Sequence, residues 1–294
     1  MDQQEWLAQR FEEHRPHLRA VAYRMLGSLS ETDDAVQDAW LRVSRADASE
    51  VENLRAWLTT IVGRVALNML RSRTTRREQP LEVRVPDPVI DPADGTDPEH
   101  EALLADSVGL ALLVVLETLT PAERLAFVLH DMFAVPFEEI APMVERSPEA
   151  TRQLASRARR RVRGAAPVPD PDLTAQWEVV EAFLAAARDG DFDALVAVLD
   201  PDVVLRADGG GLTELSRHVQ GAAAVAGQAL FWSQQVDLTI RHALVNGAPG
   251  IVSLRDGRAF SVGAFTVKNG KIVEVDFLAD PERIARLDLN VLDD

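Results

Sequence analysis

A segment rich in proline and aspartate divides the chain into parts that must fold separately. It covers residues 80–98 and reads PLEVRVPDPVIDPADGTDP. This composition buries too little apolar surface to fold alone and is typical of an acidic linker. A shorter break of the same kind, AAPVPDPD, follows Gly164. The length of 294 residues leaves room for two or three domains around these breaks.

Hydrophobic spacing predicts helices on both sides of the long linker and a mixed domain at the end of the chain. Apolar residues before residue 80 and from 99 to 164 recur at helical spacing. The last part begins with helices and continues with strand-like runs, separated by the hairpin signals Asp256-Gly257 and Asn269-Gly270. We expect an all-α domain at 1–80, a linker at 81–98, a second all-α domain at 99–164, a linker at 165–173 and an α+β domain at 174–294.

The charge is distributed unevenly. The formal net charge of −16 argues, taken alone, against nucleic acid as a partner. Residues 64–77 nevertheless carry five arginines and no acidic residue, and residues 146–163 carry seven arginines and one glutamate. A phosphate-binding surface needs only a local basic patch, so these two segments are candidates for binding nucleic acid. Solvated helix faces give the same pattern.

The segment FEEIAPMVERSPEATRQLASRARRRVRG, residues 137–164, has the layout of a helix-turn-helix. In this motif the second helix enters the major groove, where arginine can pair with guanine and glutamine with adenine. Arg159, Arg161 and Arg163, further along that helix, suit contacts with phosphates. The alternative is an ordinary helical hairpin. The residues expected to point outward near the start of the second helix are Thr151, Arg152, Gln153, Ser156, Arg157 and Arg160.

Two further surfaces are expected in the first 80 residues. Trp57 begins a helix whose far end is rich in arginine, and an aromatic ring beside a basic face can support unstacked bases. Trp57 can equally belong to the core. The preceding helix places four acidic or polar side chains on one side. This side of the helix either binds a basic protein surface or is solvated. These four are Asp33, Asp34, Gln37 and Asp38.

Three stretches resemble the conserved regions two and four of extracytoplasmic-function (ECF) sigma factors. They are RMLGSLSETDDAVQDAWLRV, NLRAWLTTIVGRVALNML and LTPAERLAFVLHDMFAVPFEEIAPMVERSPEATRQLASRARRRV. The chain is similar to the SigJ-like branch, which ends in a SnoaL-like domain of the cystatin-like cone type. That part of the likeness rests on DVVLRADGGG, the strand hairpins and DPERI. Leu212 stands where the branch often has lysine after DGGG, and PLEVRVPDP is only a loose version of its linker motif.

The resemblance implies that residues 1–80 are sigma region 2, 99–164 sigma region 4, and 174–294 a SnoaL-like domain. Region 4 would bind the polymerase β flap, and the linker would thread the polymerase near its active site. The face that docks on the clamp helices of the β′ subunit would comprise Asp33, Asp34, Gln37, Asp38 and Trp40. The −10 promoter element would be bound by Asn53, Arg55, Trp57, Arg64, Asn68, Arg71, Arg73, Arg76 and Arg77. The −35 element would be bound by Ser147, Thr151, Arg152, Gln153, Ser156, Arg157 and Arg160.

The last domain is expected to regulate rather than catalyse. SnoaL-like cones enclose an apolar pocket, and some relatives are enzymes. Candidate acids and bases are Asp208, His218, His242 and Asp276, but no spacing among them specifies a catalytic site. The scattered histidines indicate no metal, and no cofactor is expected. The domain would contact the sigma regions or the linker, and a small ligand can be imagined in its cone. Its expected regulatory loop is Asp208, Gly209, Gly210 and Gly211.

The leading interpretation is therefore a cytoplasmic sigma factor whose partners are core RNA polymerase and promoter DNA. The chain has no cysteine, which excludes disulfides, thiolate metal sites and a cysteine nucleophile. It shows no signal peptide and no apolar run long enough to span a membrane. Two alternatives stay open: a helix-turn-helix regulator that acts without polymerase, and a SnoaL-type enzyme that acts on a hydrophobic small molecule.

Overall fold

The computed structural model describes residues 3–46, 51–76, 84–93, 95 and 109–289. These residues form two compact units. The first unit comprises residues 3–46, 51–76 and 115–165, and the second comprises 84–93, 95, 109–114 and 166–289. The helix expected to resume near residue 99 falls partly outside the described residues, and its described part, α5, spans Leu110–Glu117. Among the described helices, none combines the length and the apolar character needed to cross a membrane.

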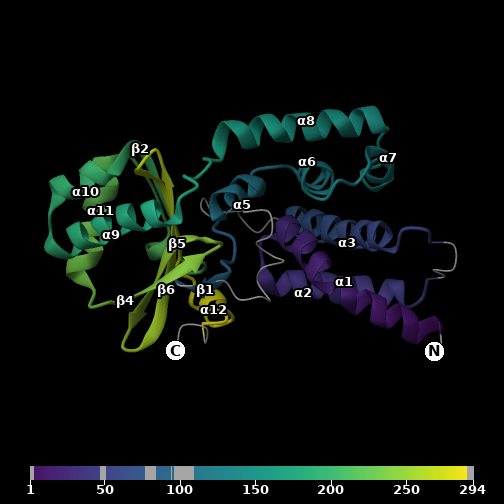
Figure 1. The fold of residues 1–294 in the computed structure, drawn as a ribbon, viewed down its shortest axis with the longest axis horizontal. Coiled ribbons are helices and arrows are strands. Elements are labelled where there is room, and N and C mark those ends of the chain that lie inside the picture. Colours follow the sequence, from purple (N-terminus) through teal and green to yellow (C-terminus); the bar gives the residue numbers. More distant parts are fainter. Residues whose placement is uncertain (1–2, 47–50, 77–83, 94, 96–108, 290–294) are drawn as a thin grey trace. The chain divides into compact units, whose positions relative to one another are not determined.

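The first half of the first unit is a three-helix bundle, as the apolar spacing predicts (Figure 1). Its helices are α1 (Gln3–Leu26), α2 (Leu29–Val43) and α3 (Leu54–Arg76). α1 ends where Gly27 adopts a φ of 63°, a left-handed conformation that glycine takes without a side-chain clash. The three helices bury their apolar faces against one another, and Tyr23, Met25, Leu58 and Leu67 are among the fully buried side chains.

The second half of this unit contains the predicted helix-turn-helix. Thr120 and Glu123 form a reciprocal capping box at the start of α6, as the TPAE sequence predicts. The turn before the last helix includes Glu145 at a φ of 56°, and the Arg146 amide donates to the Ala141 carbonyl at 3.1 Å. The elements are α6 (Pro121–Phe127), a π-helical turn (Val128–Met132), α7 (Phe137–Ile140), a 3₁₀ turn (Ala141–Met143) and α8 (Pro148–Ala165).

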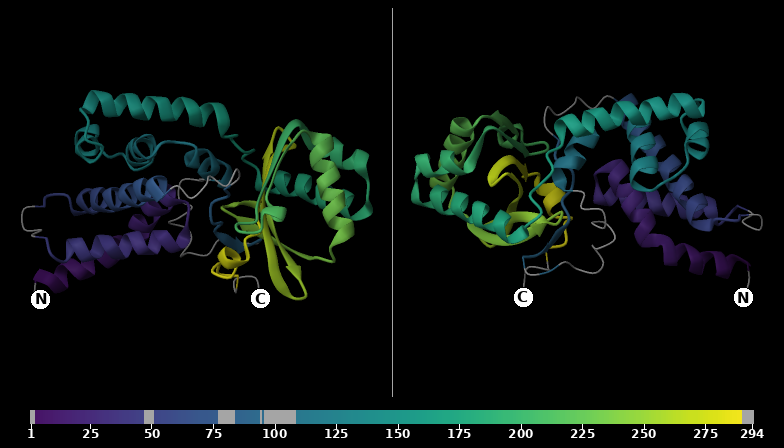
Figure 2. Two further views of the ribbon diagram at one scale, coloured as in Figure 1. Left: turned by 180° about the vertical axis from the view of Figure 1, so that it is seen from behind. Right: turned by 45° about the horizontal axis from the view of Figure 1, so that its top comes forward.

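The second unit is a curved mixed sheet with helices α9, α10 and α11 on one face (Figure 2). The strand order is β1-β4-β5-β6-β7-β2-β3, and of these pairs only β2–β7 is parallel. The helices are α9 (Leu173–Asp189), α10 (Phe192–Val198), α11 (Ala222–Gln235) and α12 (Pro281–Ile284). The strands are β1 (Ile90–Pro92), β2 (Leu199–Asp208), β3 (Arg217–Gln220), β4 (Thr239–Val245), β5 (Ala248–Arg255), β6 (Arg258–Lys268) and β7 (Lys271–Leu278).

Three two-residue turns set the register of the β4–β7 meander. Asp256-Gly257 and Asn269-Gly270, both predicted, have positive φ at each residue, as a type I′ turn requires. Asn246-Gly247 forms a third turn of the same kind between β4 and β5. The sequence predicts strands on both sides of this third turn. The turn itself was not predicted, although Asn246-Gly247 carries the same Asn-Gly signal.

Part of the proline-rich segment forms an edge of this sheet. Residues 90–92 pair antiparallel with β4, and Val85, Val89 and Ile90 are buried. Val85, Asp87 and Asp91 each precede a proline, which disfavours helix and favours extended backbone. The segment cannot fold alone, but its alternating valines and aspartates suit a strand that docks on an existing sheet. Strands β1 and β3 were not predicted.

Phe265 on β6 lies in the core between the sheet and its helices, and its substitution tests this core. Its ring is fully buried and lies 5.6 Å from Phe183 and 6.4 Å from Phe277, measured between ring centroids. We expect Phe265→Ala to lower the free energy of unfolding of the second unit by about 3–5 kcal/mol, because it leaves a cavity. Urea unfolding followed by circular dichroism measures the change. Phe231→Ala is the matched control, since that ring is 53% exposed, and an equal loss in both variants would contradict the assigned core.

Candidate nucleic-acid and polymerase interfaces

Helix α2 presents an acidic face to solvent. Asp33, Asp34, Gln37 and Asp38 are all exposed, and the opposite face of the helix, which includes Val36, is buried in the bundle. The Arg19 guanidinium donates to Asp33 at 3.0 Å, which leaves the other carboxylates of this face to solvent or a partner. Trp40 is half-buried, with its ring 5.1 Å from that of Phe11. Trp40 therefore holds α2 on α1 and keeps part of its surface accessible.

The start of α3 places three of the candidate −10 residues within one helical turn. Asn53 precedes the helix, and its side-chain oxygen accepts from the Ala56 amide at 3.0 Å. Arg55 is exposed. Trp57 is half-buried, so it is neither a fully buried core residue nor a free platform.

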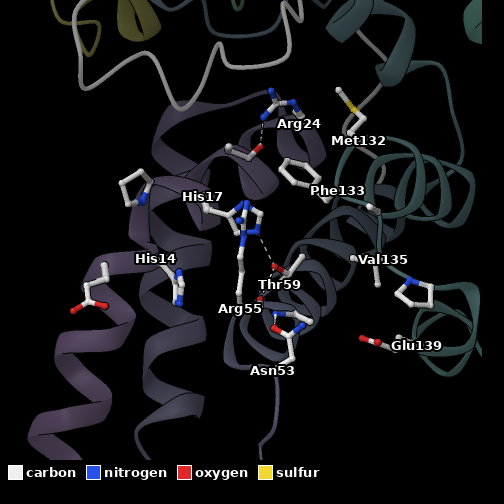
Figure 3. Close-up of a pocket in the computed structure, with 16 residues that line it drawn as sticks. His14, His17, Arg24, Asn53, Arg55, Thr59, Met132, Phe133, Val135 and Glu139 are labelled. Atoms are coloured by element: carbon white, nitrogen blue, oxygen red, sulfur yellow. Dashed lines mark hydrogen bonds between the residues drawn. The ribbon is translucent and has the colours of Figure 1, made fainter.

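Asn53 and Arg55 line a pocket of about 930 Å³ within the first unit (Figure 3). Its other walls come from α1, with His14, His17 and Arg24, and from the segment after the π-helical turn. The latter contributes Phe133, Val135 and Glu139 to the lining. The pocket therefore brings residues of the expected region 2 and of the expected region 4 together.

His17 is a titratable group of this pocket whose pKa departs from its ordinary value. Its Nε2 lies 2.8 Å from Thr59 Oγ1, and its Nδ1 lies 3.0 Å from an Arg55 guanidinium nitrogen. Burial, followed by the nearby positive charges of Arg55, His14 and Arg24, lowers the pKa of His17 to about 4. The imidazole is therefore neutral at physiological pH. A sequence in which this histidine is one of six gives no signal for this role.

The arginines further along α3 do not form one uniform DNA-facing row. Arg64 and Asn68 are exposed, and Arg71 lies 3.8 Å from the Glu145 carboxylate. Arg73, expected among the −10 residues, makes contacts within the unit. Its guanidinium pairs with Glu31 and donates to the Leu26 carbonyl at 3.2 Å, which ties α3 to the junction of α1 and α2.

The last two arginines of the expected −10 set cannot be placed. The side chain of Arg76, at the end of α3, and the whole of Arg77 lie outside the described residues.

Helix α8 exposes most of the residues expected to read the −35 element. Ser147, Arg152, Gln153, Arg157 and Arg160 are exposed, and Ser156 is half-buried. The Arg152 guanidinium lies over the Phe137 ring, 5.2 Å from its centroid, which restricts the side chain before any DNA is bound.

Thr151 was expected to point outward, and the structure shows that it does not. Its side chain is fully buried, and its hydroxyl donates to the Ser147 carbonyl at 3.0 Å. The first turn of α8 is wound against the preceding helix, so a residue one turn after the cap faces inward. Two of the expected phosphate-binding residues are also engaged within the unit: Arg159 pairs with Asp131 at 2.6 Å and Arg161 with Glu123 at 3.5 Å.

In the second unit, a cluster of charged side chains holds the proline-rich segment on the sheet. The Arg283 guanidinium donates to Asp208 at 2.8 Å, to Asp87 at 2.6 Å and to the Val85 carbonyl at 2.6 Å. Asp208 also accepts from the Val85 amide at 3.0 Å. Only 1% of Asp208 is exposed. We call Val85, Asp87, Asp208 and Arg283 the linker clasp.

A second anchor of this segment lies next to the Asn246-Gly247 turn. The Val89 amide donates to the Asn246 side chain at 3.1 Å, and the Asn246 amide donates to the Val89 carbonyl at 2.8 Å. Residues 84–92 are thus held at both ends. The expected regulatory role singled out Asp208 but not Arg283, Asp87 or Asn246, whose roles depend on contacts between distant parts of the sequence.

The three glycines after Asp208 differ in what they do. Gly210 has a φ of 57°, and a Cβ at this position would lie within 2.0 Å of the Asp280 carboxylate. A Cβ on Gly209 would lie 2.5 Å from the Leu212 carbonyl, whereas Gly211 has open space. The first two glycines therefore let the chain turn tightly beside Asp280, the residue that caps the helix carrying Arg283.

The other acid and base candidates of this unit are engaged separately. Asp276 accepts from Arg206 at 3.0 Å, and Glu274 accepts from the same guanidinium at 3.0 Å. Burial raises the pKa of Asp276 to about 6, although Arg206 opposes the shift. His242 lies 3.0 Å from Glu181, and both are exposed. His218 is exposed on β3, where it lies opposite Arg206 in the β2–β3 pair.

Comparison with known proteins gives a consistent identity along the chain. Residues 10–76 match the Sigma-70 region 2 model, residues 109–162 the Sigma-70 region 4 model, and residues 180–275 the SnoaL-like domain model. The chain is 39% identical to the ECF RNA polymerase sigma factor SigJ of Mycobacterium tuberculosis, over 93% of this chain and 91% of that protein. It is 32% identical to the probable ECF RNA polymerase sigma factor SigI of the same species, over 97% of both chains. The crystal structure of M. tuberculosis SigJ superposes with a TM-score of 0.76 at 37% identity, covering 96% of this chain and 99% of that one.

The ion pair of Arg73 yields a prediction on stability. Arg73→Ala should lower the free energy of unfolding of the first unit by about 1–3 kcal/mol, because it leaves the partly buried Glu31 carboxylate and the Leu26 carbonyl without this donor. Arg64→Ala, on the exposed face of the same helix, should change it by about 0.5 kcal/mol or less. Chemical denaturation monitored by circular dichroism compares the two. Equal effects would show that Arg73 is not part of the packing.

Proposed function

The chain belongs to the ECF family of RNA polymerase sigma factors, and on this premise we propose that it binds core RNA polymerase and directs transcription from specific promoters. One observation carries the proposal. A single compact unit exposes both an acidic face on α2 and an arginine- and glutamine-bearing face on α8. A repressor that acts alone needs only the second face, so the acidic helix favours a sigma factor over that alternative.

The polymerase-docking role is assigned to the acidic face of α2. Exposed carboxylates complement a basic protein surface and speed its encounter with the partner. In this proposal Asp34, Gln37 and Asp38 meet the clamp helices of the β′ subunit, together with Asp33 and the accessible edge of Trp40. Region 4 meets the β flap. The cytoplasm, where polymerase works, is the proposed location.

Promoter recognition is assigned to two surfaces of the same unit. The start of α3, with Asn53, Arg55 and Trp57, is proposed to capture the opened −10 element, and Arg64 and Asn68 extend this surface. The exposed face of α8 is proposed to read the −35 element in the major groove. Arg73 and Thr151 are left out of these sets, because the structure engages both in internal packing. The −35 set is thus Ser147, Arg152, Gln153, Ser156, Arg157 and Arg160.

The C-terminal domain is proposed to control the factor by holding its linker. Residues 84–92 connect the two sigma regions, and the linker clasp keeps them on the sheet of the SnoaL-like domain. The clasp biases the factor only if the docked and released linkers differ in their contacts with polymerase. In this proposal the two states differ in charge, because Asp87 pairs with Arg283 in the docked segment and would meet a basic channel after release.

An enzymatic role for this domain is not part of the proposal. Asp208 and Asp276 are each paired with a half-buried arginine, and the candidate histidines, His218 and His242, are exposed. General acid–base catalysis needs a group that can reach a substrate with its proton. The arrangement therefore supports a structural use of these carboxylates.

Run-off transcription with core polymerase tests the sigma function and its −35 residues together. The wild type should initiate from a defined −35/−10 pair. Arg152→Ala and Arg157→Ala should each weaken recognition of the −35 element by about 1–3 kcal/mol, the range for a lost bidentate base contact. Arg188→Ala, an exposed arginine on α9, is the matched control and should have no effect. An unchanged promoter profile for both α8 variants would show that another face reads the DNA. Failure of the wild type to bind core polymerase would reject the sigma function.

Release of the linker is tested at Arg283. Arg283→Ala should free residues 84–92, because it leaves the carboxylates of Asp87 and Asp208 buried without their cation. Trypsin cleavage after the exposed Arg84 should then speed up by roughly tenfold or more, as the segment opens more often. Promoter-dependent transcription should change in the same variant. Arg286→Ala, one turn further on and exposed, serves as the control. Unchanged cleavage in Arg283→Ala would remove the clasp from the mechanism.

A further inference from the structure

His17, Arg55 and Thr59 form a closed ring of hydrogen bonds at the edge proposed to meet the −10 element. An arginine side chain only donates hydrogen bonds, so the bond between Arg55 and His17 fixes Nδ1 of the imidazole as the acceptor. The neutral ring then carries its hydrogen on Nε2 and donates to Thr59 Oγ1 at 2.8 Å. The Thr59 hydroxyl donates in turn to the backbone carbonyl of Arg55 at 2.8 Å. The ring therefore starts at the Arg55 guanidinium and ends at the Arg55 backbone (Figure 3).

Each hydrogen-bonding group of this ring has a fixed role as donor or acceptor. Thr59 is 2% exposed, and its single hydroxyl hydrogen is spent on the carbonyl, so it can only accept from His17. The Phe133 ring meets the imidazole edge-on, with 5.3 Å between the ring centroids. Only the alternative with hydrogen on Nε2 satisfies all three bonds. The arrangement selects one tautomer of the neutral histidine.

The ring leaves the guanidinium of Arg55 oriented but available. Among the described residues, this guanidinium makes no hydrogen bond or ion pair other than the one with His17. The side chain is exposed, and the donors that His17 does not use are open to a ligand. A long exposed side chain normally loses rotamer freedom when it binds, and prior restraint reduces that loss. His17 thus does for Arg55 what a supporting residue does in a preorganised site.

We propose that His17 is a positioning residue for promoter opening: in its Nε2-protonated neutral form it holds the Arg55 guanidinium ready for the −10 strand. This inference rests on the proposed function of the start of α3. His17 lies on α1 and is not proposed to contact the DNA itself. It acts through Arg55.

Burial, and after it the surrounding basic groups, keep this histidine neutral. The positive groups facing it are Arg55 on α3 and His14 and Arg24 on α1, and the pocket is also lined by Glu13 on α1 and Glu139 on α7. A proton on Nδ1 would remove the acceptor for Arg55 and place two cations in contact. The lowered pKa, about 4, therefore preserves the ring across the physiological range. Because the pKa of His17 in the folded state lies below its ordinary value of 6.5, its contribution to stability is fully present above pH 6.5 and is lost as the pH falls toward 4.

Two substitutions separate the two ends of the imidazole. His17→Asn keeps an acceptor near the position of Nδ1 and loses the bond to Thr59. His17→Gln keeps a donor near the position of Nε2 and loses the acceptor for Arg55. His14→Gln is the matched control, since His14 lies one turn earlier on α1 and lines the same pocket. Circular dichroism establishes that each variant is folded before it is assayed.

The experiment measures opening of promoter DNA by holoenzyme assembled with the full-length chain, using 2-aminopurine fluorescence in the −10 element. His17→Gln should lower the opening rate by about two- to tenfold, the range for one immobilised side chain. His17→Asn should keep most of the rate, and His14→Gln should keep all of it. In an Arg55→Ala background, His17→Gln should have no further effect, because the residue through which it acts is gone.

The outcomes that overturn the inference are distinct from those that overturn the proposed function. Equal loss in His17→Asn and His17→Gln, or an undiminished effect of His17→Gln in the Arg55→Ala background, means that His17 only supports the fold. A ring nitrogen spectrum with hydrogen on Nδ1 also rejects the proposal. If Arg55→Ala opens promoters at the wild-type rate, the assignment of Arg55 to the −10 strand falls and the inference falls with it. A wild-type holoenzyme that opens no promoter rejects the sigma function itself.

Discussion

The second unit depends on how it neutralises buried charge on one face of its sheet. Arg283 faces the two carboxylates of Asp87 and Asp208, and Arg206 faces those of Glu274 and Asp276. Arg206 and Asp208 are two residues apart on β2, so their side chains point to the same face of the sheet. Both clusters therefore lie on this face, and the helices pack on the other face. A buried ion cluster is costly to break from one side, because the remaining charge has no water to solvate it. The ion pairs of Arg283 hold the segment that begins at residue 84 on the helix that carries this arginine. The fold of the domain and the path of the linker therefore depend on the same contacts.

The sequence predicts features that depend on local chemistry and misses those that depend on distant contacts. The capping box at Thr120, the helix-turn-helix and the hairpins at Asp256 and Asn269 follow from a few neighbouring residues, and the structure has all of them. The linker clasp joins residues about two hundred positions apart, and no periodicity reports such a contact. Charge counting also has a limit. Arg73 and Arg64 look alike in the sequence, yet one is spent on Glu31 and the other faces solvent.

The chain uses arginine for two different purposes. On α8, Arg152 and Arg157 stay at the surface, where the proposed function has them meet phosphates or base edges. In the sheet, Arg206 and Arg283 are mostly buried, and their planar, multiply donating heads bridge two acceptors at once. The shorter reach and single point of charge of lysine would not serve the bridging role. A composition with 31 basic residues, nearly all arginine, is therefore informative about packing as well as about DNA.

The prolines of the docked segment have a consequence for the solubility of the protein. Pro86, Pro88 and Pro92 have no amide hydrogen, so the docked segment 84–92 offers few donors to any strand that approaches it. The segment thus terminates the sheet and guards it against pairing with a second molecule. Strand β4, beneath it, has no proline, and its backbone is unprotected once the segment departs. Under the proposed linker release, the undocked state exposes the β4 edge, so capture of the linker by polymerase would also limit self-association.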